Sequence, residues 1–156
     1  MTEWARRPRI AATLLNPALL AAVQSVAARE YERAAGRPMP WPVAFIVAPL
    51  VLHSPSREAL PSSTRTHLST WVSRNALIRA GFPKRATELA PFVREGLRFG
   101  FRHQVLDLHE GGLRGTLRPG GDAHLSELLT SAGLVGRWLA KTNQPSTAFA
   151  LFGVAP

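Results

Sequence analysis

The segment WPVAFIVAPLVLHSPSREALPSSTRTHLSTW, residues 41–71, begins with the most apolar run of the chain, residues 43–52. A run this apolar must be covered by other parts of the folded protein. Since a helix needs about 20 apolar residues to cross a bilayer, this shorter run is a core segment, and we expect no membrane span. Pro42 suits the first turn of a helix, and Pro49 predicts a kink or break near Ala48.

The second half of the same segment is polar and rich in turn-forming residues. Ser54 or Ser56 is expected to cap a short turn, with Arg57 and Glu58 as surface charges. The hydroxyls of residues 62–64 then offer caps for a second helix. The apolar positions of that helix are Leu68, Trp71 and Val72.

A long amphipathic helix is predicted before this segment. Asn16 caps it, Pro17 takes its first position and Gly36 ends it. Its apolar face has a spacing of three and four residues and consists of Leu19, Leu20, Val23, Val26, Ala27, Tyr31 and Ala34. Residues 37–40 form an extended linker, because each proline biases the preceding residue away from helix.

A third amphipathic segment follows a connector at residues 75–82. Pro83 opens this segment, and Pro91 predicts a kink or two short helices. Its apolar face consists of Phe82, Ala86, Leu89, Ala90, Val93, Leu97 and Phe101. On the opposite side Arg94, Arg98 and Arg102 fall four residues apart and form one ridge, which is either a solvated face or a binding face for a polyanion.

Residues 104–118 change to an alternation of apolar and polar side chains around the turn Glu110-Gly111-Gly112, which predicts a β-hairpin. Arg114, Thr116 and Arg118 would point away from its core face. Asp122 caps a further helix. Residues 147–154 predict a terminal strand that pairs with the hairpin, or a tail donated to a partner.

The predicted fold is therefore mainly α with one β-hairpin. Helices followed by a hairpin have the order of a winged helix-turn-helix, in which the hairpin is the wing. One domain is the default for 156 residues. We expect a single winged-helix-like domain over residues 16–156, preceded by an N-terminal arm at residues 1–15.

Short motifs in this chain resemble a known family. They are Asn16-Pro17-Ala18, PLVLH at residues 49–53, SREALP at residues 56–61, and Gly153-Val154. Together they resemble the middle component of bacterial three-component ABC systems, and through it the small subunit of Lamassu-type phage-defence complexes. The family ending reads Gly-Val-Arg-Pro, whereas this chain has Ala155, so it lacks that arginine.

The chain is strongly basic, with 19 Lys+Arg against 10 Asp+Glu and a net charge of +9. All but two of the basic residues are arginines, which bind phosphate and carboxylate through two hydrogen bonds. The excess reflects either a composition rich in Arg, Ala, Gly and Pro, or a nucleic acid or acidic partner. The candidate nucleic-acid-binding residues are Lys84, Arg85, Arg94, Arg98, Arg102, Arg114 and Arg118.

Motifs of enzymes and cofactor sites are missing from the sequence. There are no cysteines, the five histidines form no HxxxH pair, and neither GxxxxGK[ST] nor GxGxxG occurs. His53, Ser54, Ser56 and Glu58 share one turn, but residues this close in sequence rarely place a nucleophile and its base correctly. We expect no catalysis, no metal, no cofactor and no small-molecule substrate.

Two hypotheses for the function follow. The resemblance implies a cytoplasmic, non-catalytic adaptor that joins an SMC-like ABC ATPase to an effector or sensor subunit and contacts double-stranded DNA. The alternative is a stand-alone winged-helix transcription regulator, which would be a symmetric dimer; co-purification with the ATPase separates the two. The candidate partner-binding residues are Trp4, Trp41, His53, Arg57, Glu58, Phe149 and Phe152.

Overall fold

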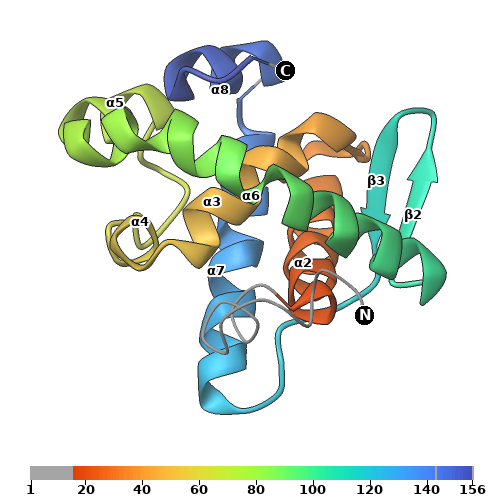
Figure 1. Ribbon diagram of the computed structural model, residues 1–156. Coiled ribbons are helices and arrows are strands. Elements are labelled where there is room, and N and C mark those ends of the chain that lie inside the picture. Colours follow the sequence, from red (N-terminus) through yellow and green to blue (C-terminus); the bar gives the residue numbers. More distant parts are fainter. Residues whose placement is uncertain (1–15, 143, 156) are drawn as a thin grey trace.

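The computed structural model of the chain describes residues 16–142 and 144–155 (Figure 1). Trp4 and the predicted arm at residues 1–15 therefore lie outside the described residues. The elements in chain order are α2 (Pro17–Ala35), β1 (Met39–Pro40), the 3₁₀ helix η2 (Trp41–Val43), α3 (Ala44–Leu52), α4 (Ser54–Glu58), α5 (Leu68–Arg74), α6 (Ala76–Arg102), β2 (Leu106–His109), β3 (Gly112–Gly115), α7 (Ala123–Ala140) and α8 (Pro145–Phe152). The prediction of a mainly helical fold with one hairpin is confirmed.

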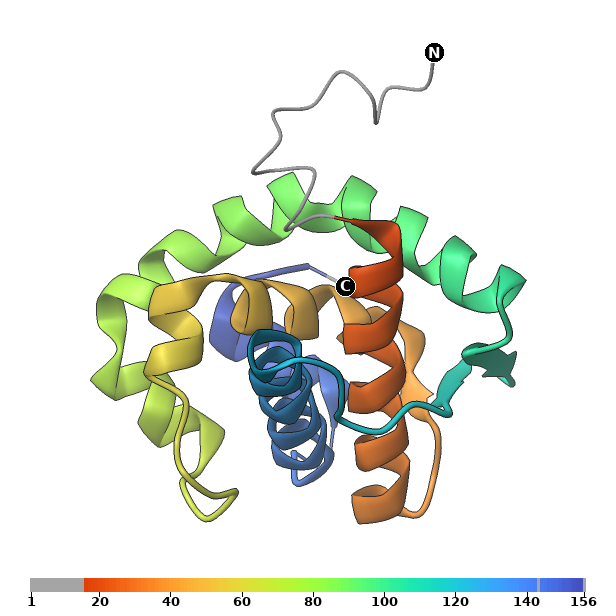
Figure 2. The ribbon, with the colours of Figure 1, turned by 90° about the horizontal axis from the view of Figure 1, so that it is seen from below.

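Helix α2 lies at the centre and contacts α6, α7 and β3 (Figure 2). Its predicted ends are confirmed: the Asn16 side chain accepts a hydrogen bond from the Ala18 N–H at 2.7 Å, and Gly36 adopts the left-handed conformation with φ 75°. Because neighbours surround it, α2 is buried along most of its length, and even Gln24 and Ser25 are fully buried.

Two glycines allow other elements to approach the backbone of α2. A Cβ atom on Gly115 of β3 would overlap the Ser25 carbonyl group, and one on Gly136 of α7 would overlap the Ala27 carbonyl oxygen. The Ser25 hydroxyl also donates to the Val105 carbonyl at 2.7 Å and accepts from the Thr116 N–H at 3.0 Å. The hairpin is thus fixed directly to the central helix.

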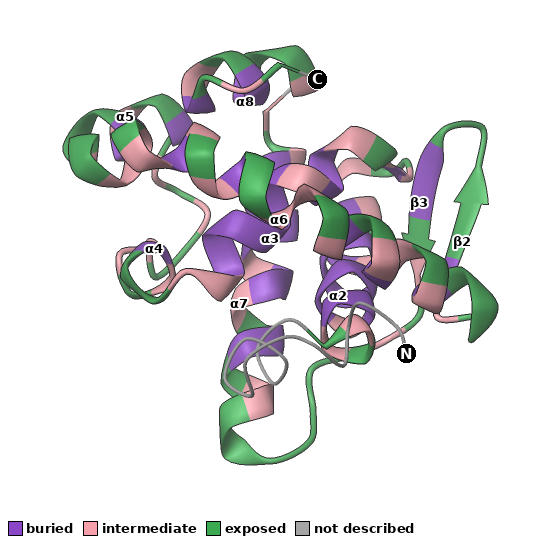
Figure 3. Ribbon diagram, viewed as in Figure 1, coloured by how far each residue is buried: buried purple, intermediate pink, exposed green. Residues whose placement is uncertain are grey.

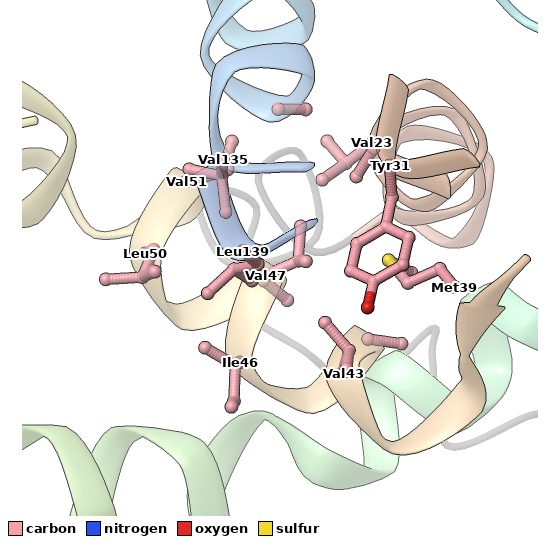
Figure 4. Close-up of a cluster of buried hydrophobic side chains, with 14 of the residues drawn as sticks. Val23, Tyr31, Met39, Val43, Ile46, Val47, Leu50, Val51, Val135 and Leu139 are labelled. Carbon is pink, nitrogen blue, oxygen red and sulfur yellow. The ribbon is translucent and has the colours of Figure 1, made fainter. Parts of the chain in front are cut away.

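Helix α3 contains the apolar run and is buried on almost every side (Figure 3). Its valines meet Val135 and Leu139 of α7, with Val23 and Tyr31 of α2 close by (Figure 4). The predicted break near Ala48 is wrong, since the helix continues through Pro49 to Leu52. The proline removes one backbone hydrogen bond, and burial of the whole helix outweighs that loss.

The structure of α6 shows that the second prediction based on prolines, a connector followed by a kinked or divided helix, is wrong. Residues 76–102 form one helix that includes both Pro83 and Pro91, so there is no connector at 75–82 and no division into two helices. The helix arches over the rest of the molecule (Figure 2), with its convex side toward solvent, as long helices usually bend. Its contacts with α2 and α3 keep it continuous.

Three smaller predictions also need correction. Residues 145–152 form helix α8 rather than a strand, and the third strand of the sheet is β1, in the order β1-β3-β2. His53, rather than Ser54 or Ser56, caps α4, because its ring accepts from the Ser56 N–H. His67 precedes α5 without a side-chain cap, so the hydroxyls of residues 62–64 do not cap that helix.

The predicted docking role of Phe149 and Phe152 assumed exposed side chains, and this assumption is wrong. Phe149 is 3% exposed and Phe152 is fully buried. The Phe152 ring lies 4.4 Å from that of Phe82, between ring centroids, and also meets Trp71. Helix α8 therefore covers the core. Within the described residues, no helix is long and apolar enough to cross a membrane.

Glu30 forms an ion-pair centre between α2 and α7. Its carboxylate lies 2.9 Å from Arg29, 3.2 Å from Arg33 and 3.2 Å from Arg137.

Replacing Glu30 by alanine is expected to lower the free energy of unfolding by about 1–3 kcal/mol, because three guanidinium groups lose a buried acceptor. Urea denaturation measures this. Glu88→Ala, which removes a pair at 3.9 Å between exposed groups, is the control and should change stability by less than about 1 kcal/mol.

Candidate functional site

The predicted arginine ridge is confirmed as an exposed feature of α6. Arg94, Arg98 and Arg102 are all exposed, four residues apart along the helix. At a rise of about 1.5 Å per residue the ridge is about 12 Å long. Lys84 lies further back on the same helix, where it pairs with Glu88 at 3.9 Å.

Arg85 does not belong to this ridge. Its guanidinium group donates to the Ile78 carbonyl at 2.8 Å, lies 6.0 Å from the centre of the Phe82 ring, and packs over Gly81. Burial lowers the pKa of Arg85. A side chain held in this way stabilises α6 and is not free to bind phosphate.

Two more candidate arginines follow α6 in the chain: Arg114 lies on β3, and Arg118 lies in the loop between β3 and α7. Arg114 and Arg118 are both exposed, as predicted. Arg114, however, forms an ion pair with Glu32 at 3.0 Å, so part of its charge is already neutralised. The turn at Glu110-Gly111 has positive φ at both residues, 51° and 78°, as a tight hairpin turn requires.

The turn at residues 53–58 mainly makes local contacts. The His53 Nδ1 atom lies 2.6 Å from the Ser56 hydroxyl, and Arg57 donates to the Val51 carbonyl at 2.7 Å. Burial, followed by the charge of Arg85, lowers the pKa of His53. Ser56 is fully buried, so a substrate has no access to its hydroxyl, while Glu58 is exposed. Among the described residues, no three His, Asp or Glu side chains come together as a metal site would require.

The structure also has a groove that the sequence did not reveal, and Arg94 is one of the residues that line it. Its volume is about 510 Å³, and it is formed by η2, the start of α3, the middle of α6 and the C-terminal tail. Trp41, which is 48% exposed, meets Phe45 edge-to-face with 6.1 Å between ring centroids. The Arg94 guanidinium lies 5.9 Å from the centre of the Phe45 ring. The lining residues are Trp41, Pro42, Phe45, Ala86, Thr87, Ala90, Pro91, Arg94, Phe149, Val154 and Ala155.

The structure thus has an exposed arginine ridge and an apolar groove that meet at Arg94. A family model, described as ABC-three component (ABC-3C) system Middle Component 3, matches residues 4–156. The chain belongs to this family. No curated protein and no solved structure matches it. The resemblance seen in the sequence is therefore confirmed over nearly the whole chain.

For an ABC-3C middle component, the family places the chain in a system of several components, which implies protein partners. Of the predicted partner-binding residues, Trp41 is exposed on the groove, His53 and Arg57 are half-buried in local contacts, and Phe149 lies in the groove floor. Phe45 was missed, because in the sequence it cannot be distinguished from the buried residues of the apolar run around it.

Proposed function

We propose that this protein is a non-catalytic adaptor of a bacterial anti-phage ABC-3C system. It joins an SMC-like ABC ATPase to an effector or sensor subunit in the cytoplasm and contacts double-stranded DNA through α6. The observation that carries the proposal is the family match over residues 4–156. A small chain in the middle of a three-component system, without the motifs of an enzyme, is suited to joining the other two proteins.

The arrangement of α6 and the hairpin supports the DNA contact. In a winged helix-turn-helix, a helix that enters the groove of DNA is followed by a hairpin. Here α6 ends at Arg102 and β2 begins at Leu106, so ridge and hairpin are close neighbours. The sheet has the order β1-β3-β2, so β1, which lies in the linker between α2 and α3, pairs with strand β3 of the hairpin. We therefore infer a winged-helix-like domain.

Replacing Arg98 and Arg102 together by alanine should weaken DNA binding by the assembled complex about equally for all sequences. Each lost phosphate contact lowers the slope of log affinity against log salt by about one, so we expect a decrease of about two. Fluorescence anisotropy with a labelled duplex over a series of salt concentrations measures this slope.

The matched control replaces Arg65 and Arg74, which are exposed on and before α5. This variant should keep the salt slope of the unmodified complex. An unchanged slope in the variant at Arg98 and Arg102 would show that the ridge is a solvated face. Co-purification with the ATPase separates the adaptor from a stand-alone regulator, which would bind DNA as a dimer of this chain alone.

A further inference from the structure

We propose that the groove beside Trp41 binds an acidic segment with apolar anchor residues, contributed by one of the other two proteins of the system. In this proposal Arg94 binds the acidic segment, and of the arginine ridge only Arg98 and Arg102 contact DNA. The inference rests on the proposed adaptor function and adds the docking site and the chemistry of its occupant.

One wall of the groove is aromatic, and its backbone is hydrogen-bonded to the hairpin turn. Trp41 follows directly on β1, and its backbone N–H donates to the Gly111 carbonyl of the hairpin turn at 3.1 Å. Its ring is nevertheless 48% exposed beside Phe45. An exposed tryptophan on a rigid backbone is typical of the few residues that supply most of the binding energy at an interface.

The charge of the groove selects an acidic occupant. Arg94 is the one ionisable side chain among the described residues that line it. Its guanidinium lies 5.9 Å from the centre of the Phe45 ring, so a carboxylate of a bound segment can pair with Arg94 while neighbouring apolar side chains of that segment contact the groove walls. The net charge of +9 adds long-range attraction for an acidic partner.

The same features disfavour three other occupants. A second copy of this chain also has a charge of +9. Residues 1–15 of the chain carry Arg6, Arg7 and Arg9 against one acid, Glu3, so Arg94 would repel them. Single-stranded nucleic acid needs a groove with several cations that follow its backbone, whereas Arg94 is the one cation among the described residues that line this groove.

Photo-crosslinking in the assembled complex tests the proposal. A p-benzoyl-phenylalanine at position 87 would sit on the exposed rim of the groove and leave its aromatic wall intact. We expect irradiation of the co-expressed three-component complex to link this position to a segment of the ATPase or the third subunit that contains Asp or Glu. Crosslinks to residues 1–15, to a second copy, to nucleic acid or to nothing would overturn the inference.

Binding of a synthetic peptide with the crosslinked sequence then tests whether Trp41 and Arg94 contribute to the groove's affinity. Trp41→Ala and Arg94→Glu should each weaken it at least tenfold. The matched controls are Leu77→Ala, which removes a side chain that is 90% exposed, and Arg74→Glu, and both should bind as the unmodified chain does. A peptide with its acids replaced by lysine should recover binding to the Arg94→Glu chain. Equal binding by all variants would overturn the inference.

Failure of this inference can be distinguished from failure of the adaptor proposal. If the unmodified chain co-purifies with neither of the other two proteins, the adaptor proposal is wrong. If it co-purifies with them, but Trp41→Ala and Arg94→Glu do so equally well and position 87 gives no crosslink, only the groove assignment is wrong. Circular dichroism melting curves check that each variant is folded.

Discussion

Replacing Gly136 by alanine is expected to lower the melting temperature of the protein by about 10 °C. The new Cβ atom would overlap the Ala27 carbonyl oxygen of α2, so α7 would have to move away from the central helix. Overpacking of this kind costs about 3 kcal/mol, and in a chain of this size each kcal/mol shifts the melting temperature by roughly 2–4 °C. Differential scanning calorimetry measures the change.

Gly120→Ala is the matched control for this prediction. A Cβ atom on Gly120 would have no neighbour within 4 Å, and the residue has no positive φ, so the melting temperature should stay within about 2 °C of the unmodified value. If Gly136→Ala and Gly120→Ala have the same melting temperature, the close contact between α2 and α7 does not exist in solution.

Replacing Phe152 by alanine should have a still larger effect, about 3–5 kcal/mol. The side chain is fully buried and lies against the rings of Phe82 and Trp71, so its removal leaves a cavity that rigid aromatic neighbours cannot fill. Urea denaturation of the isolated chain measures the loss. Phe101→Ala removes the same group from a position that is 38% exposed and should cost much less.

This result also distinguishes a core role from a docking role. If Phe152 were a contact for a partner, its removal would weaken the complex and leave the stability of the isolated chain unchanged. Equal stability of Phe152→Ala and Phe101→Ala would contradict the buried position of Phe152.

The sequence predicts best those parts of the fold that depend on neighbouring residues. The ends of α2 follow from Asn16 and Gly36, and the hairpin follows from its alternation and its two consecutive glycines. The arginine ridge follows from a spacing of four on one helix. In each case the signal and the structure lie within one segment of the chain.

The remaining parts depend on contacts between distant segments. Pro83 and Pro91 disfavour a helix locally, but packing on α2 and α3 keeps α6 continuous. A short apolar run such as residues 147–154 can form a strand or a helix, and Trp71 and Phe82 help to determine the outcome. The groove combines Trp41, Ala90 and Val154, whose proximity no local pattern indicates.

The position of α8 after the elements that it covers, α5 and α6, has a consequence for protein synthesis. During translation the chain emerges from its N-terminus, so Phe82 and Trp71 are made well before Phe149 and Phe152, which cover them. The Arg79 side chain likewise meets its acceptor, the Leu151 carbonyl at 2.7 Å, only after α8 has been made. A nascent chain is therefore left with an uncovered aromatic cluster until residues 145–152 are added, and a stop codon before Pro145 should yield an aggregating product.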